Sequence, residues 1–244
     1  MDVHVLAHTP DPLRVIYTAA RTCYSAGRPS ELWAEDPPRA RMERLIRQVV
    51  ESGHHSVLEH ASFTLALEGL SRSCSHQLVR HRLASYSQQS QRYVQGPFPY
   101  VTPDSWARAG DELLRRYHQA MADIGHLYRE ALAAGIPAED ARFILPQATT
   151  TNLTMTMNVR ELVHTVGLRT CARAQWEIQE LFARVAEAVR RIDAFLGSLL
   201  VTKCERLGYC DERETCGRYP GIGERGLASG DRASGLVFPI TNNQ

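Results

Sequence analysis

The chain has 244 residues, of which 43% are hydrophobic and 23% charged, and its formal net charge is +1. This composition is typical of a globular protein, and the lack of a basic excess argues against a general nucleic-acid binder. No apolar run approaches the roughly 18 residues of a membrane helix, so we expect no membrane partner. The first residues have neither the basic nor the apolar region of an export signal. We therefore expect a cytoplasmic protein whose six cysteines are thiols.

Hydrophobic periodicity predicts helices and a few widely spaced strands. The predicted strands cover residues 3–6, 62–68 and 149–158. The predicted helices cover residues 12–24 and 40–51, a stretch from Asp104 to a stop at Gly135, and residues 176–200, and a polar loop with three prolines covers 27–38. We therefore expect an α+β fold with a single domain, residues 1–203, in which a small, mostly antiparallel sheet is packed with helices and the last helix is long. An irregular C-terminal tail, residues 204–244, would follow it.

The least ordinary stretch starts at Arg80-His81-Arg82 and runs through a series of Ser and Gln to Arg92. Gln77 and Arg80 share one helix face at spacing i, i+3. The Ser and Gln side chains disfavour a long regular element and supply hydrogen-bond donors and acceptors at short reach. The plain interpretation is a solvated helix end followed by a polar turn. The alternative is a binding site for an anionic small molecule, which guanidinium forks suit.

A second cluster, residues 53–60, carries three histidines that would fit a zinc hydrolase. However, His55, Glu59 and His60 are spaced one residue wider than the inverted zincin pattern requires. Three cysteines near the C-terminus, Cys204, Cys210 and Cys216, are also spaced more widely than the ligands of most zinc sites. We therefore expect no metal, while a zinc hydrolase using His54, His55 and His60 stays open as an alternative.

A third cluster holds Arg160 and His164 four residues apart, and Arg169 and Arg173 four residues apart. Like charges at that spacing on a helix repel, which is tolerable on a solvated face or around a bound anion. A second alternative is therefore a regulatory nucleotide-binding or RNA-contacting module built on the Arg-His-Arg loop. RNA binding would need an extended basic face with exposed aromatic residues, whereas aromatic residues make up only 7% of the chain.

These clusters resemble the flavin-dependent thymidylate synthases. The family signature is Arg-His-Arg, seven residues and Ser, which here is Arg80-His81-Arg82 and Ser90. The likeness extends from about residue 15 to about residue 200 and includes His54, Glu59, His60 and the segments 141–146, 158–160, 168–169 and 174–178. The chain departs from the family at Ser87-Gln88, where Asn-Glu is common, at Arg173, where some members have His, and at Cys23, where others have Ser.

The resemblance implies an enzyme that reductively methylates dUMP to dTMP. The carbon would come from methylenetetrahydrofolate and the hydride from FAD reduced by NADPH. Because the flavin carries the hydride chemistry, the protein need only bind, orient and polarise. The family also implies a homotetramer with active sites shared between subunits, a catalytic domain over residues 1–203, and no nucleic-acid partner.

The resemblance assigns residues to three roles. The implied substrate contacts are Gln77, Arg80, Gln88, Gln89, Ser90, Gln91, Arg92, Arg142 and Arg169. The implied flavin contacts are Ser56, Glu59, Arg80, His81, Arg82, Gln88, Asn158, Arg160 and His164. The implied catalytic residues are Arg169, His54 and Ser90. Arg169 would stabilise negative charge that develops on the uracil, and His54 would lie near the flavin. For Ser90 we favour substrate positioning, because a serine nucleophile needs an adjacent base.

Overall fold

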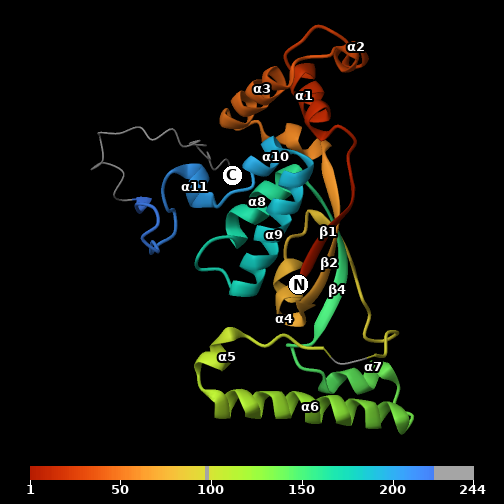
Figure 1. Cartoon of the computed structure of the whole chain (residues 1–244). Coiled ribbons are helices and arrows are strands. Elements are labelled where there is room, and N and C mark those ends of the chain that lie inside the picture. Colours follow the sequence, from red (N-terminus) through yellow and green to blue (C-terminus); the bar gives the residue numbers. More distant parts are fainter. Residues whose placement is uncertain (97–98, 223–244) are drawn as a thin grey trace. The chain divides into compact units, whose positions relative to one another are not determined.

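The computed structural model describes residues 1–96 and 99–222, which form an α+β fold around one small sheet (Figure 1). Its four antiparallel strands are β1 (Asp2–His8), β2 (Ser62–Ser71), β3 (Ala84–Gln88) and β4 (Thr150–Asn158), and their spatial order is β1-β2-β4-β3. Side chains along β4 alternate between buried and accessible, as the alternation of Thr with Leu153, Met155 and Met157 requires. The predicted small, mostly antiparallel sheet is confirmed.

The fold divides into two compact units. The first unit consists of Met1–Asp2, Ala66–Arg80 and Tyr86–Thr154. The second unit consists of Val3–Leu65, His81–Ser85 and Met155–Gln244, of which the structure describes the part up to residue 222. The Arg80-His81-Arg82 signature therefore places one residue in the first unit and two in the second.

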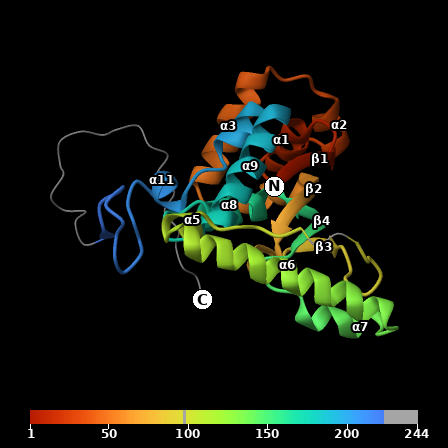
Figure 2. The same cartoon turned by 60° about the horizontal axis from the view of Figure 1, so that its bottom comes forward.

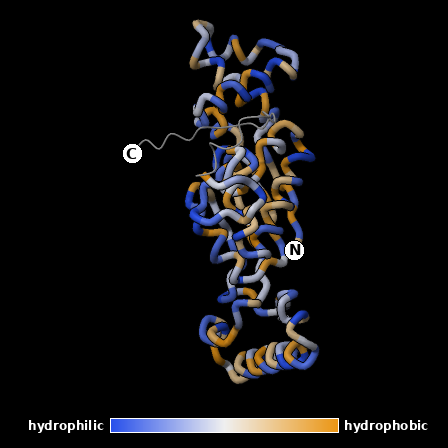
Figure 3. The backbone as a smooth tube through the Cα atoms, turned by 90° about the vertical axis from the view of Figure 1, so that its left-hand side faces the viewer, coloured by the Kyte–Doolittle hydropathy of each residue, from blue (hydrophilic) through white to orange (hydrophobic). Residues whose placement is uncertain are grey.

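The first unit is mainly helical outside its strands. Its helices are α4 (Arg72–Leu78), α5 (Asp104–Arg108), α6 (Asp111–Ala133), α7 (Ala138–Ala141) and the 3₁₀ helix η2 (Arg142–Ile144). The single helix predicted from Asp104 is in fact α5 and α6, because Gly110 between them has φ 113°, which a helix does not tolerate. The buried face of α6 contains Tyr117, Met121 and Tyr128. Figure 2 shows α7 beside α6, and Figure 3 shows hydrophilic and hydrophobic residues interspersed along α6.

The second unit holds the remaining helices. They are α1 (Pro12–Thr22), α2 (Pro29–Ala34), α3 (Arg39–Glu51), the 3₁₀ helix η1 (His55–His60), α8 (Val159–Arg169), α9 (Trp176–Ile192), α10 (Ala194–Ser198) and α11 (Lys203–Leu207). The predicted loop over residues 27–38 is wrong, since it contains α2. Pro29 occupies the first helical turn, where its missing N–H costs nothing, and Glu31 caps the start by accepting from the Arg28 N–H at 3.0 Å.

The predicted helix over residues 176–200 is broken into α9 and α10 at Asp193. This residue has extended backbone angles, and its carboxylate, only 6% exposed, accepts from the Leu196 N–H at 2.9 Å. The same carboxylate receives two hydrogen bonds of 3.0 Å from the Arg39 guanidinium on α3. Just beyond it, α10 approaches the last turn of α9 so closely that a Cβ on Gly197 would lie 2.5 Å from the Cα of Arg190.

The predicted irregular tail is only partly correct. Its start lies within α11, which Thr202 caps by accepting from the Glu205 N–H at 3.2 Å. An isolated bridge then joins Cys210 to Gly221, and residues 223–244 lie outside the described part. The predicted domain boundary at residue 203 stays a prediction. No helix within residues 1–96 and 99–222 has the length and apolar character needed to cross a membrane.

Candidate functional site

The polar stretch after Arg82 forms strand β3 before it becomes a loop. Gln88, at the end of β3, donates to the hydroxyls of Ser75 at 3.0 Å and Thr151 at 3.3 Å. The backbone of Gln89 donates to the Asn152 carbonyl at 2.9 Å, and the Asn152 side chain donates to the Gln89 side chain at 3.2 Å. These bonds attach the start of the loop formed by residues 89–92 to β4, within the first unit.

Two arginines of the first unit, Arg72 and Arg142, are near enough for the charge of one to affect the other. Arg72, at the start of α4, donates to the Gln89 carbonyl at 2.9 Å, while its buried Nε has no hydrogen-bond partner in the described residues. Burial lowers the pKa of Arg72, and the neighbouring charge of Arg142 lowers it further. A cation in this position is stabilised by any anion that reaches both guanidinium groups.

The loop after β3 presents the other predicted substrate residues. The Ser90 hydroxyl accepts from the Arg92 N–H at 3.2 Å, so it supports the turn that carries Arg92. Arg92 is exposed and pairs with Glu139 of α7 at 3.0 Å. Gln91 is half-buried on the same turn. An exposed pair of this kind is weak, so Arg92 can exchange Glu139 for a ligand at little cost.

The predicted helix face shared by Gln77 and Arg80 is wrong. Helix α4 ends at Leu78, and Arg80 lies in the following turn, where its N–H donates to the Gln77 carbonyl at 3.4 Å. The turn leaves Arg80 exposed and Gln77 half-buried. The two residues are nevertheless close in the fold, because the turn directly follows the helix.

In the second unit, η1 and the start of α8 bring together predicted flavin residues. Asn158 caps α8 by accepting from the Glu161 N–H at 2.9 Å, and the Val159 N–H donates to the Ala61 carbonyl at 2.9 Å. This arrangement pairs the exposed side chains of Glu59 and Arg160. Glu59 therefore forms one local group with Asn158 and Arg160, although it is about 100 residues away from them in sequence.

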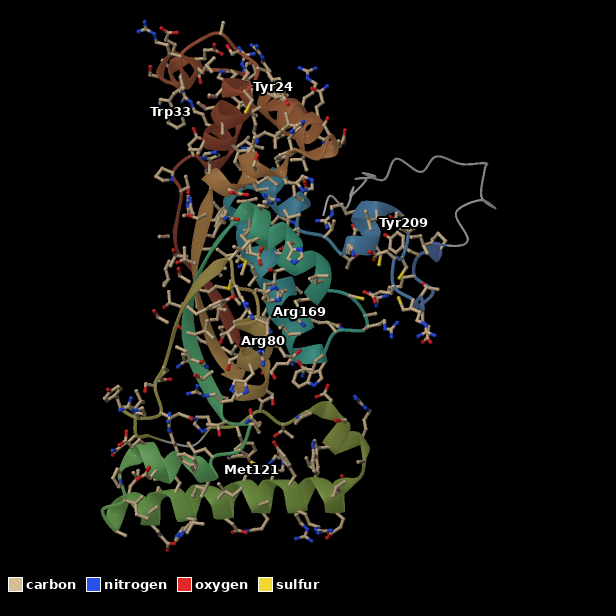
Figure 4. The ribbon with its side chains drawn as sticks, turned by 180° about the vertical axis from the view of Figure 1, so that it is seen from behind. Tyr24, Trp33, Arg80, Met121, Arg169 and Tyr209 are labelled. Carbon is tan, nitrogen blue, oxygen red and sulfur yellow. The ribbon has the colours of Figure 1, made fainter. Side chains whose placement is uncertain are left out.

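His81 lies at the centre of a second group. It is 7% exposed, and its Nε2 accepts from the Nε–H of Arg169 at 2.9 Å. Arg169 is the last residue of α8 and is labelled in Figure 4. Its ring meets His164 edge-on, with ring centroids 6.4 Å apart. Burial lowers the pKa of His81 to about 4, with further contributions from the charges of Arg169 and His164. His81 is therefore a neutral hydrogen-bond acceptor for Arg169 at neutral pH.

This low pKa predicts a pH dependence of folding stability. The unfolded chain, with a histidine pKa near 6.5, binds more protons than the folded chain between pH 6.5 and about 4. The stabilisation is thus complete above pH 6.5 and is lost as the pH falls through this window. We expect His81 to account for about 2 kcal/mol of unfolding free energy lost between pH 7 and pH 5. Urea titrations at both pH values would measure this loss in the wild type and in His81→Gln, which should lack it. Equal pH slopes in the two proteins would contradict the prediction.

His54 lines a cavity of about 300 Å³ in the second unit. Its ring meets Tyr24 edge-on, with centroids 6.4 Å apart. The cavity lies between α1, α3 and the residues before η1, and its lining residues are Ala20, Arg21, Tyr24, Leu45, Gln48, Val49, Ser52 and His54. His54 is exposed, so it can face a ligand there.

The remaining predicted residues show one further departure. Ser56 and Arg82 are exposed. Arg160 and His164 share α8 as predicted, but the predicted helical pairing of Arg169 with Arg173 is wrong, since α8 ends at Arg169. Arg173 instead donates to the Glu214 carbonyl at 2.7 Å.

The zinc alternatives find little support in the geometry. His55 Nε2 lies 3.1 Å from the Val50 carbonyl oxygen, a backbone contact. In the described part of the chain, the only three His, Cys, Asp or Glu residues whose ligand atoms all lie within 4.8 Å are His81, Glu161 and His164. A cation there would compete with the Arg169 guanidinium for His81. Burial raises the pKa of the Cys204 thiol to about 11, and the neighbouring Cys210 thiol, to which it is hydrogen-bonded, adds to the rise.

Sequence reasoning missed four residues that these groups contain: Arg72, Asn152, Glu161 and Thr165. Each lies either in a segment whose apolar pattern alone was interpreted or at a position to which the sequence analysis assigned no role. Arg72 lies between the predicted strand 62–68 and the polar stretch, where the sequence pattern assigns it no role. Thr165 gives no sequence signal, because a threonine on an apolar helix face resembles a core residue.

Comparisons with known proteins identify the family. The family model described as "Thymidylate synthase complementing protein" matches residues 4–193. A flavin-dependent thymidylate synthase of Nitratidesulfovibrio vulgaris is 47% identical over 233 residues, covering 89% of this chain and 95% of the relative. A flavin-dependent thymidylate synthase of Pyrococcus abyssi is 42% identical over 224 residues, covering 87% of this chain and 90% of the relative.

The fold is also similar to a solved structure. The crystal structure of flavin-dependent thymidylate synthase from Helicobacter pylori, complexed with FAD and dUMP, has a TM-score of 0.65 and 25% sequence identity. The similarity covers 83% of this chain and 100% of that chain. The sequence comparisons and the fold comparison therefore lead to the same group of proteins.

Proposed function

The chain belongs to the flavin-dependent thymidylate synthase family, and we propose from this which residues bind the substrate, which bind the flavin and which act in the reaction. The enzyme converts dUMP to dTMP with FAD. The observation that carries this conclusion is the family match over residues 4–193, which includes the Arg80-His81-Arg82 and Ser90 signature. We assign substrate binding mainly to the first unit and flavin binding mainly to the second.

The proposed dUMP contacts are supported by the cationic character of the first unit. Among the described residues, the side-chain hydrogen bonds of Arg72 and Arg142 go to the backbone carbonyls of Gln89 and Glu139, so both guanidinium charges suit a phosphate dianion. Arg92 lies on the turn supported by Ser90 and can leave Glu139 for the phosphate. The Gln88 side chain, fixed by Ser75 and Thr151, would orient the nucleoside through hydrogen bonds. This arrangement supports positioning, rather than nucleophilic attack, as the role of Ser90.

The proposed flavin contacts are supported by exposed polar groups of the second unit. Arg82, Arg160 and His164 are exposed donors, and guanidinium groups suit the pyrophosphate of FAD. Glu59 pairs with Arg160 at the start of α8, and because both side chains are exposed, Arg160 can exchange this partner for the flavin at little cost. When bound, FAD supplies the hydride that reduces the transferred carbon. In the proposed role of Arg169, its guanidinium, oriented by His81, stabilises negative charge that develops on the uracil.

The proposal extends to co-substrates and assembly. Methylenetetrahydrofolate would provide the carbon, and NADPH would reduce the flavin. A homotetramer with shared active sites follows from the family resemblance, and a cytoplasmic location is part of the same proposal. His54, which lines the cavity between α1 and α3, would face a ligand beside the flavin.

The proposed function predicts a two-step spectroscopic and chemical result. Purified protein reconstituted with FAD should show flavin absorption bands that bleach with NADPH in the absence of oxygen. Addition of dUMP and methylenetetrahydrofolate should then produce dTMP, measured by chromatography, and restore the bands. Reactions that lack either methylenetetrahydrofolate or FAD are the controls and should form no dTMP.

Three results would each count against a part of the proposal. Absence of bound flavin after reconstitution would favour nucleotide binding without catalysis. Bleaching by NADPH without dTMP formation would support a flavoprotein but exclude the methylation of dUMP. Light scattering that gives a particle of about the monomer mass, 27.4 kDa, at micromolar concentration would overturn the tetramer.

A further inference from the structure

Four side chains of the second unit form a continuous hydrogen-bonded series, which we call the Arg169 network: Arg169, His81, Thr165 and Glu161. Arg169 and His81 are 2.9 Å apart between Nε and Nε2. His81 Nδ1 and the Thr165 hydroxyl are 3.2 Å apart, and that hydroxyl and the Glu161 carboxylate are 3.3 Å apart. The last three residues are buried, with exposures of 7%, 0% and 7%. Buried polar groups that are all partnered hold one arrangement.

The direction of every bond in the Arg169 network follows from the donor and acceptor inventory. A guanidinium has no acceptor, so Arg169 must donate, and His81 Nε2 must carry a lone pair. His81 is neutral at pH 7, so its proton is on Nδ1 and is donated to the Thr165 oxygen. The Thr165 hydroxyl then directs its own proton to Glu161, whose carboxylate only accepts. Each step fixes the next.

We propose that Thr165 and Glu161 are positioning residues for the reaction: they fix the Nδ1–H tautomer of His81, which in turn orients the guanidinium of Arg169. This inference rests on the proposed function, because it assumes that Arg169 acts on the substrate. Neither residue would touch the substrate or the flavin. They would affect the reaction only by setting the orientation of the Arg169 guanidinium plane.

Helix α8 is well suited to this role. Glu161 and Thr165 are four residues apart on it, as are Thr165 and Arg169, so all three lie along one helix face. Asn158 fixes the first turn through its bond to the Glu161 N–H. Phe182 of α9 confines the His81 ring edge-on, with centroids 6.2 Å apart. Only a hydroxyl at position 165 can both accept from His81 and donate to Glu161 with so small a side chain.

The test combines histidine NMR with turnover in the full-length protein containing FAD. In the wild type at pH 7, the ¹⁵N spectrum should show His81 protonated at Nδ1 and unprotonated at Nε2. The signals are assigned by their loss in His81→Gln. Thr165→Val keeps the shape but removes the hydroxyl, so it should change the His81 tautomer ratio and lower kcat for dUMP by about tenfold. Thr165→Ser should restore both to within about twofold.

Two variants complete the design. Glu161→Gln keeps an acceptor for the Thr165 hydroxyl but removes the charge, and it should lower kcat less than Thr165→Val. Thr170→Val is the matched control, because the Thr170 hydroxyl, directly after the same helix, bonds only to the Val166 carbonyl in the described residues. It should leave the His81 spectrum and kcat unchanged. Retained flavin absorption and melting temperature would show that each variant is folded.

Each other outcome would overturn the proposal. A wild-type His81 that is protonated at Nε2 would reverse the direction of the network. If Thr165→Val altered the His81 tautomer but left kcat unchanged, the hydrogen bond between Thr165 and His81 would have only a structural role. A failure of the proposed function itself would be recognised separately, because the wild type would then form no dTMP while the NMR spectrum still reported the state of His81.

Discussion

Arg169→Ala is expected to lower the turnover of dUMP by at least about a hundredfold while leaving flavin absorption unchanged. Removal of one preorganised donor that faces developing charge typically costs a factor of about 10² to 10³ in kcat. Arg169 is preorganised in this sense, because it ends α8 and its Nε–H is held by His81 at 2.9 Å. The effect should fall on kcat more than on the binding of FAD, since Arg169 is assigned to the substrate.

The measurement is dTMP formation at saturating dUMP, together with a titration of FAD binding. Arg169→Lys keeps the charge but not the Nε–H that bonds to His81, so it should recover only part of the loss. Arg184→Ala on α9 is the control, because that exposed arginine pairs with Glu180 on its own helix. If Arg169→Ala retained kcat within about threefold of the wild type, Arg169 would have no role in the chemical step.

Asp193→Ala is expected to lower the free energy of unfolding by about 3 kcal/mol. The carboxylate caps α10 through the Leu196 N–H, a contribution of about 1 kcal/mol. It also accepts two hydrogen bonds from Arg39, and bonds to a charged group contribute about 1.5–3 kcal/mol. Arg39 is half exposed and pairs with Glu43, so it can be solvated after the loss, which limits the cost.

Urea unfolding at fixed protein concentration would measure this loss. Asp193→Ser separates its two parts, because a serine retains the cap but cannot replace the pair with Arg39. We expect it to lose about 2 kcal/mol, and Arg39→Ala to lose a similar amount because a buried carboxylate is left behind. A loss below about 1 kcal/mol in Asp193→Ala would show that the junction of α9 and α10 does not depend on this carboxylate.

Asp193 also illustrates what the sequence could predict of the fold. The apolar spacing that defines α9 continues through Phe195 and Leu199, so periodicity alone indicates one long helix. The break depends on Arg39, more than 150 residues away, which no local pattern includes. Strands β2 and β4 are predicted nearly in full, because alternation along a half-buried strand is a local property. Helix α2 is missed, since prolines, which are typical of loops, can also begin a helix.

The candidate site is predictable where it consists of unusual residues in fixed spacing. The Arg-His-Arg stretch and the residues around Arg160 stand out as polar clusters in the sequence alone. Their partners do not, because Arg72 and Thr165 acquire their roles only through burial and through neighbours distant in sequence. The helix predicted through Arg80 failed for a similar reason, since residues 77–80 do not encode where α4 ends and the turn begins.

The close approach at Gly197 has a consequence for any attempt to redesign this protein. Because the hydrogen on its Cα is all that separates α10 from the backbone of Arg190, no choice of rotamer elsewhere can make room for a side chain there. The reversal of direction between α9 and α10 is thus encoded by two nearby features, a carboxylate that ends one helix and a residue without a side chain in the next. A sequence library built on this backbone could exchange the apolar residues at the junction of α9 and α10 for others of similar volume. It would have to keep glycine at position 197.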